Sequence, residues 1–132
     1  MRALLIVMSI VEAGAGLALV AVPSLIASLL FGTPLEGAMP VVVGRLVGVA
    51  LLSLGVMCWL ARDDVDSRAA AGVVGGMLVY NTGATALFLY GMFGQGLIGM
   101  LTWIAIIVHG ALAIWCAVCL RAAYLPGGGV AR

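Results

Sequence analysis

Single polar residues set in long apolar stretches are the features of this chain that could do chemistry. They are Glu12, Arg45, Asn81 and His109. An ionisable side chain inside a bilayer costs on the order of 3 kcal/mol, so each has to face the protein interior and find a partner there. Counted at about 1.5 Å per residue, three of them reach one level near the membrane midplane, and Arg45 lies somewhat closer to the outer surface.

The pairing inside this polar cluster has more than one solution. Glu12 could pair with Arg45, whose long side chain reaches along the helix, or with His109, with which it could share a proton. Asn81 could bond His109 in a cluster that only fixes how the helices pack. We favour a functional site, either a ligand pocket or a proton-handling centre, because polar groups this deep in a membrane are usually functional.

The predicted site is a pocket that binds a small amphipathic molecule, quinone-like or lipid-like. Arg45 would meet an anionic or carbonyl group, while His109 and Asn81 would supply directional hydrogen bonds and Glu12 would set the local charge. The candidate ligand-binding residues are Glu12, Arg45, Asn81, His109, Trp103 and Tyr80. No cofactor is identified.

A Cys-x-x-Cys pair, Cys116 and Cys119, follows His109 on the same apolar stretch. The pair lies about 10 to 15 Å further along a helix, which is too far to share a metal with the imidazole. Cys58 would end at the same level, so three thiols could hold a soft metal or form a disulfide. The odd number and a reducing cytoplasm favour buried apolar roles instead, and a haem would lack a second intramembrane histidine. We predict no metal site.

The elements that position these residues follow from composition. The chain has 132 residues, of which 65% are hydrophobic and 8% charged, and its mean hydropathy is +1.30. Such a chain is predicted to be an integral membrane protein. The stretches 41–61, 71–93 and 97–120 each reach the roughly 20 residues that cross a hydrocarbon core of about 30 Å.

The first apolar stretch, 3–31, is too long for one span, and Pro23 divides it. We predict a span over 3–22 and a short helix over 23–31 lying at the membrane interface, because Pro at its start and Gly32 after its end are typical helix boundaries. The fold class is therefore an all-α, four-helix integral membrane bundle in one domain over 1–125. The tail 126–132 is predicted to be flexible.

Arginine placement predicts the orientation. With both termini in the cytoplasm, the arginines of the loops and termini all lie on the cytoplasmic side, as the positive-inside rule requires: Arg2, Arg62, Arg68, Arg121 and Arg132. The loop 62–68 is predicted to be a helix cap and a short polar turn with internal ion pairs, and not a metal site. The expected location is the bacterial inner membrane.

Glycine spacing predicts where helices pack closely. Gly44 and Gly48, and likewise Gly72 and Gly76, have the small-x-x-x-small spacing of tight helix contacts. These contacts could serve the bundle itself or a homodimer.

The succession "AVPSLIASLLFG", "GRLVGVALLSLGVMCWLARDD", "YN" and "HGALAIWC" resembles a group of small bacterial membrane proteins in the DoxX-like neighbourhood, over nearly the whole chain. The resemblance implies a compact four-helix bundle. Some proteins of that neighbourhood associate with oxidoreductase complexes, but this chain lacks an outward-facing redox cysteine pair.

The segment "VEAGAG" also resembles the first helix of small multidrug-resistance transporters, which carry one essential glutamate there. The other sequence features of that family are absent from this chain. Two alternative functions remain. One is a small proton-coupled transporter of this dimeric type, and the other is a structural subunit of a larger membrane complex. An enzyme is disfavoured because there is no nucleophile with an adjacent base and no nucleotide loop. The expected partners are lipid and a small ligand, and no nucleic acid.

Overall fold

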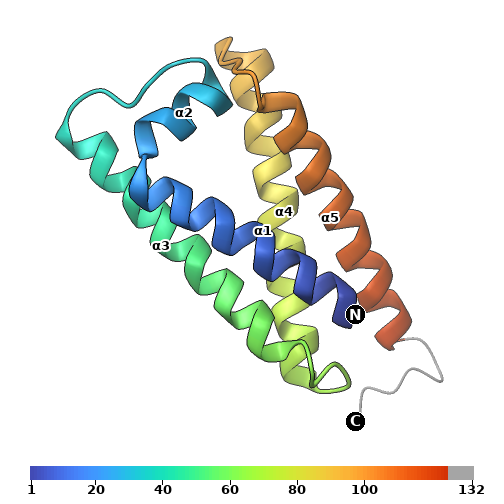
Figure 1. The fold of residues 1–132 in the computed structure, drawn as a ribbon. Helices are drawn as coiled ribbons and strands as arrows, with labels where there is room; N and C mark the ends of the chain where they lie inside the picture. The colour runs from blue at the N-terminus through green and yellow to red at the C-terminus, as the bar shows by residue number, and fades with distance from the viewer. Residues whose placement is uncertain (125–132) are drawn as a thin grey trace.

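The structure, a computed structural model, describes residues 1–124 and is all-helical over them (Figure 1). The helices are α1 (Arg2–Ala21), α2 (Pro23–Phe31), α3 (Ala38–Ala61), α4 (Arg68–Gln95) and α5 (Thr102–Tyr124). By length and composition, α1, α3, α4 and α5 are each able to cross a membrane. The predicted all-α, four-helix fold is confirmed, and it is compatible with an integral membrane protein. The tail 126–132, with Arg132, lies outside the described residues.

The helix boundaries differ from the predicted spans, most notably at the starts of α3 and α5, and α4 extends beyond its predicted span at both ends. Helix α3 begins at Ala38 and not at residue 41, with Pro40 accommodated in its first turn, where no intrahelical N–H is needed. Helix α5 begins at Thr102 and not at residue 97. Gly96 ends α4 in a left-handed conformation with φ of 69°, and 97–101 then form a non-helical connection that contacts α2.

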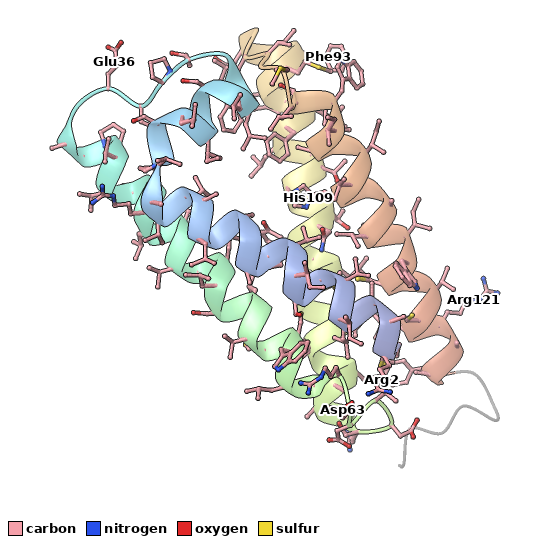
Figure 2. The ribbon with its side chains drawn as sticks, viewed as in Figure 1. Arg2, Glu36, Asp63, Phe93, His109 and Arg121 are labelled. Atoms are coloured by element: carbon pink, nitrogen blue, oxygen red, sulfur yellow. The ribbon has the colours of Figure 1, made fainter. Side chains whose placement is uncertain are left out.

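The four long helices form two pairs. Helix α1 packs along α3, and α4 packs along α5, whereas contacts between the pairs are sparse. Figure 1 shows the pairs meeting near the N-terminus and diverging toward the opposite end, where α2 lies between them. We call the end that carries Arg2, Asp63 and Arg121 the charged end (Figure 2). The end with Glu36 and Phe93 is the far end.

Two glycines bring α1 and α3 into backbone contact. A Cβ added to Gly48 would lie 2.8 Å from the Gly16 carbonyl oxygen and 2.8 Å from the Val20 nitrogen, and one added to Gly16 would lie 2.7 Å from the Gly48 carbonyl oxygen. Neither glycine can therefore carry a side chain without separating the helices. The predicted packing role is confirmed for Gly48. Gly72 and Gly76 make no such contact within this chain, since neither has an atom within 4 Å of an added Cβ, and their role in a homodimer stays a prediction.

A hydrophobic core joins the two pairs at the charged half of the bundle. Its buried members come from all four long helices: Leu4, Leu5, Met8, Cys58, Val74, Met77, Leu112 and Cys116. Because these side chains pack together near the charged end, the two helix pairs are held together there. In the far half of the bundle the pairs lie apart, and another helix fits between them.

That element is α2, the short helix that the sequence predicts after the first span, and its place at a membrane interface stays a prediction. Its start at Pro23 and its left-handed end at Gly32, with φ of 76°, are as expected. However, its last carbonyl groups, which have no partner within the helix, are bonded by the connection before α5. Leu101 donates its N–H to the Leu29 carbonyl at 2.8 Å, and Thr102 Oγ1 donates to the Leu30 carbonyl at 2.5 Å. Helix α2 is thus fixed across the far end.

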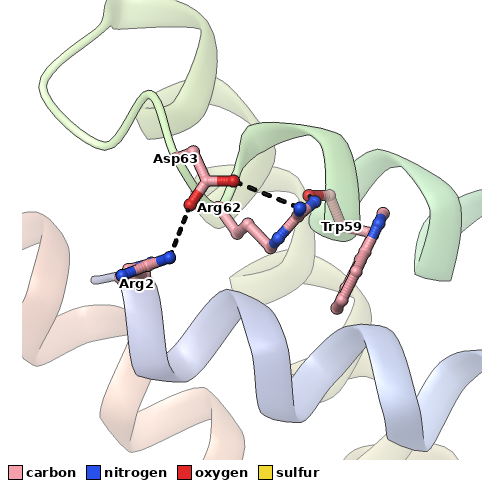
Figure 3. Close-up of polar contacts among 4 residues, drawn as sticks. All are labelled: Arg2, Trp59, Arg62 and Asp63. Atoms are coloured by element: carbon pink, nitrogen blue, oxygen red, sulfur yellow. Dashed lines mark hydrogen bonds and ion pairs between the residues drawn. The ribbon is translucent and has the colours of Figure 1, made fainter.

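The charged end carries a small network of exposed ion pairs (Figure 3). Arg2 lies 2.9 Å from one oxygen of Asp63, and Arg62 lies 3.2 Å from the other. Arg62 also donates to the Trp59 carbonyl and stacks 3.7 Å from the centre of the Trp59 ring. Ser67 caps α4 by accepting the Ala70 N–H at 3.0 Å. The predicted cap and polar turn are confirmed, and such exposed pairs contribute little stability.

The close contact between α1 and α3 predicts that adding a single methyl group at Gly48 lowers the stability of the protein. Gly48→Ala is expected to lower the free energy of unfolding by about 1 to 3 kcal/mol, because the added Cβ overlaps the α1 backbone. Gly76→Ala, on a helix face with open space, is expected to leave stability unchanged or slightly raised. Thermal unfolding in detergent measures both, and equal stabilities for the two variants would contradict the α1–α3 contact.

The attachment of α2 depends on one buried hydroxyl. Thr102→Val keeps the shape but removes the bond to the Leu30 carbonyl, so we expect a loss of about 1 to 3 kcal/mol and faster amide hydrogen exchange over α2. Thr82→Val, at an exposed position on α4, is the matched control. Unchanged exchange in α2 after Thr102→Val would show that the helix is held in another way.

Candidate functional site

A cavity of about 560 Å³ lies between the two helix pairs. Its walls come from α1 and α3 on one side and from α4 and α5 on the other, and α2 closes it at the far end. Its lining is Val11, Glu12, Ala15, Leu19, Ile26, Ala27, Leu30, Phe31, Leu35, Gly44, Val47, Leu51, Tyr80, Ala84, Leu87, Phe88, Leu101, Ile104, Ala105, Val108 and His109. Only Glu12, Tyr80 and His109 among these have polar side chains.

Helical periodicity explains how the polar side chains reach the cavity. The lining residues of α5 recur at the spacing of one helix face, at positions 104, 105, 108 and 109, and Leu101 lines the cavity just before the helix begins. The lining residues of α4, at 80, 84, 87 and 88, follow the same rule. His109 and Tyr80 therefore belong to the apolar stripes that turn toward the cavity, and Figure 2 shows His109 between the two pairs.

Glu12 is the most unusual group of the site. Its side chain is 1% exposed, and its Oε1 atom is buried without a hydrogen-bond partner in the described part of the chain. Tyr80 lines the same cavity. Neither ion pair found within residues 1–124 involves Glu12. A buried carboxyl group without a cation and with one open oxygen is costly, unless another molecule satisfies it.

His109 is held in one orientation by Asn81, as the sequence allows. Its Nδ1 lies 2.8 Å from Asn81 Oδ1, and Asn81, which is fully buried, donates from Nδ2 to the Met77 carbonyl at 2.8 Å. The second bond fixes the amide, because exchanging its oxygen and nitrogen would set two oxygens against each other. Asn81 Oδ1 can only accept, so Nδ1 carries the hydrogen. No carboxylate lies within ion-pairing distance of His109 among the described residues, which favours the neutral ring with Nε2 as an acceptor.

Aromatic rings connect this site to α2. Phe31 of α2 stacks on Phe88 of α4 with centroids 5.5 Å apart. Phe88 stacks on His109 with centroids 5.8 Å apart, and Tyr80 meets His109 edge-on with centroids 5.6 Å apart. All four rings line the cavity. Sequence reasoning missed Phe31 and Phe88. The spacing of Phe88 from Tyr80 along α4 could have indicated a shared helix face, whereas no sequence signal placed Phe31 of α2 beside them.

Three of the predicted site residues do not line the cavity: Asn81, which bonds His109, and also Arg45 and Trp103. Arg45 is exposed, does not line the cavity and forms no ion pair with Glu12 within residues 1–124. It follows Gly44, which faces α2 and the cavity, so it is turned about 100° away from that face. Trp103 is 55% exposed and also outside the lining, because it falls between the cavity-facing positions of α5. The predicted contact of Arg45 with a ligand head group has no support in this arrangement.

The thiols do not join the site. Cys58 and Cys116 are fully buried in the core of the charged half, and Cys119 packs against that core. All three are free. No group of three or more His, Cys, Asp or Glu side chains within the described residues is arranged to hold a metal. Their contribution here is apolar packing.

Comparison with known proteins gave no match: no family model fits the chain, and neither a curated protein nor a solved structure is significantly similar to it. Its function therefore has to be inferred from its own geometry.

The tautomer of His109 can be measured directly, because the chain contains a single histidine. We expect ¹⁵N NMR of histidine-labelled protein in lipid to show a neutral ring protonated at Nδ1 and unprotonated at Nε2. Asn81→Leu removes the acceptor and is expected to shift the ring toward the Nε2–H form. A wild-type spectrum with hydrogen on Nε2 would contradict the bond assignment.

Proposed function

We propose that this protein is a multi-pass membrane protein of the bacterial inner membrane whose cavity binds a small, ring-bearing amphipathic molecule of the quinone-like or lipid-like kind. The observation that carries the proposal is the buried carboxyl group of Glu12, with an open oxygen, in the wall of a large apolar cavity. A bound molecule that bonds this oxygen would remove the cost of leaving it unsatisfied.

The dimensions and walls of the cavity support a ligand of this kind. Small-molecule sites usually enclose about 300 to 1,000 Å³ and combine apolar walls with a few convergent polar groups. This cavity has the same character, with three polar side chains gathered at one part of an otherwise apolar lining. The polar part suits a head group, and the remaining walls suit a hydrocarbon tail.

The sides of the cavity support entry from the lipid phase. Val47, Leu87 and Ile104 line the cavity and are also exposed on the surface of the bundle, at 46%, 69% and 57%. They mark a rim that faces the side of the bundle and not its ends. A molecule dissolved in the bilayer could enter between the two helix pairs without crossing a polar surface, while α2 closes the far end.

Filling the cavity tests the proposal. Ala105 lines it and Ala111 is exposed on the same helix. Native mass spectrometry of protein purified from its membrane is expected to show a discrete bound small molecule in the wild type and in Ala111→Trp. In Ala105→Trp the indole occupies the cavity, so retention is expected to fall about tenfold or more. An empty wild type, or equal retention by both variants, would contradict a ligand in this cavity.

A further inference from the structure

We propose that the head group of the ligand is a primary amine, which enters from the lipid phase as the neutral base and is held as the ammonium ion after it accepts the hydrogen of the Glu12 carboxyl group. This inference rests on the proposed function, and within the lipid-like class it names the head group. Its basis is a buried acid that has no cation beside it.

Glu12 is a neutral acid in the empty protein. Its side chain is 1% exposed, and neither ion pair within residues 1–124 involves it. A charge in such a place costs far more than an uncharged carboxyl group, so the group keeps its hydrogen. Its Oε1 atom is buried and has no hydrogen-bond partner in the described part of the chain. The site therefore lacks the partner that suits an acid best, which is a base.

Charge excludes an anionic head group. The lining contains one carboxyl group and neither lysine nor arginine, and Arg45, the arginine nearest in sequence to the lining, is exposed. A phosphate or carboxylate would face Glu12 without a compensating cation, which is strongly unfavourable in an apolar site. A base has the opposite effect, because it turns the same carboxyl group into one half of an ion pair.

The transfer of the hydrogen is balanced within the cavity. The lone pair of a neutral amine meets the carboxyl group, the O–H bond of Glu12 breaks, and a new N–H bond forms, so that an ammonium ion faces a carboxylate. Since both charges arise in place from neutral groups, no ion has to cross the apolar walls. The resulting hydrogen bond is charge-assisted and roughly twice as strong as a bond between neutral groups.

A primary ammonium group also matches the polar part of the lining. It carries three N–H hydrogens, as a lysine side chain does, and the lining has three polar side chains that can each accept one. Glu12 accepts as the carboxylate. His109 accepts at Nε2, because its own hydrogen is on Nδ1 in the bond to Asn81 Oδ1. The Tyr80 hydroxyl accepts through its oxygen and keeps its own hydrogen for another acceptor.

Aromatic rings add a second attraction for this head group. Phe88 stacks on His109 with centroids 5.8 Å apart, and Phe31 of α2 stacks on Phe88 with centroids 5.5 Å apart. The face of such a ring attracts an ammonium ion, most strongly where water is excluded. A tail would leave along Leu87 and Ile104, which line the cavity and are exposed at its rim.

Binding of such an amine changes the number of bound protons. In neutral water the free amine is already protonated, so the hydrogen that leaves Glu12 appears in the solvent, about one for each amine bound. The other titratable side chains of the lining are Tyr80 of α4 and His109 of α5. Helices α2 and α3 contribute only apolar lining, and Cys58 of α3 is buried in the core of the charged half. Titration calorimetry in buffers of different ionisation enthalpy counts the released proton.

A matched set of probes tests the inference on the wild-type protein in detergent. 4-Decylbenzylamine, 4-decylbenzyl alcohol, (4-decylbenzyl)trimethylammonium and 4-decylbenzoic acid share ring and tail. Their head groups are a base, a neutral hydroxyl group, a cation without N–H hydrogens and an anion. We expect the amine to bind at least about tenfold more tightly than each of the others, with release of about one proton. The alcohol is expected to release none.

Variants separate the two proposals. Glu12→Gln keeps the shape of the side chain but has no acidic hydrogen. The preference for the amine over the alcohol and the proton release are both expected to disappear, while the alcohol still binds. Thr82→Val, at an exposed position on α4, is expected to keep both.

Three results would overturn the inference. Equal binding of all four probes, abolished by Ala105→Trp, would exclude the amine and leave the cavity as a ligand site. Binding of none would overturn both proposals. Tighter binding of the trimethylammonium probe, or amine binding without proton release, would show that Glu12 does not give its hydrogen to the head group.

Discussion

The burial of Glu12 is the constraint on which the interpretation of this molecule depends. A carboxyl group that is 1% exposed, surrounded by aliphatic walls and without a cation beside it, raises the energy of the empty protein. Helix α1 holds it there because the backbone contact of Gly16 with Gly48 fixes the distance and rotation of α1 against α3. The cost is therefore built into the packing and is not relieved by a small movement of one side chain.

The arrangement of the helices keeps space open next to this group. The core at the charged half joins the two helix pairs, and α2 separates them at the far end, where Thr102 and the connection before α5 hold its last turn. A bundle packed evenly along its length would close on Glu12. Here the same chain provides both a closed half with a packed core and a half that encloses a cavity.

Much of this fold could be predicted from the sequence, because bilayer thickness dictates the length of apolar helices. The buried positions of Glu12 and Asn81 followed from the cost of polar groups among apolar ones, and the bond between Asn81 and His109 was one of the pairings that the sequence left open. The rotation of each helix about its own axis could not be predicted in this way. One residue turns a side chain by about 100°, which was enough to place Arg45 on the outside of α3. The docking of α2 was also missed, since it depends on one backbone bond and one threonine hydroxyl from the segment around residue 101, which no hydrophobic pattern encodes.

The central claim, that the cavity beside Glu12 is where an amphipathic molecule binds, is tested most directly by photolabelling in proteoliposomes. The reagent is 4-decylbenzylamine with a diazirine in its tail, and peptide mapping locates the adducts. The account predicts adducts at the rim and wall of the cavity, on peptides with Leu30, Leu87 and Ile104, and their loss when unlabelled 4-decylbenzylamine is in excess. Adducts spread over outward positions such as Val79 and Ile114, unaffected by the competitor, would contradict it.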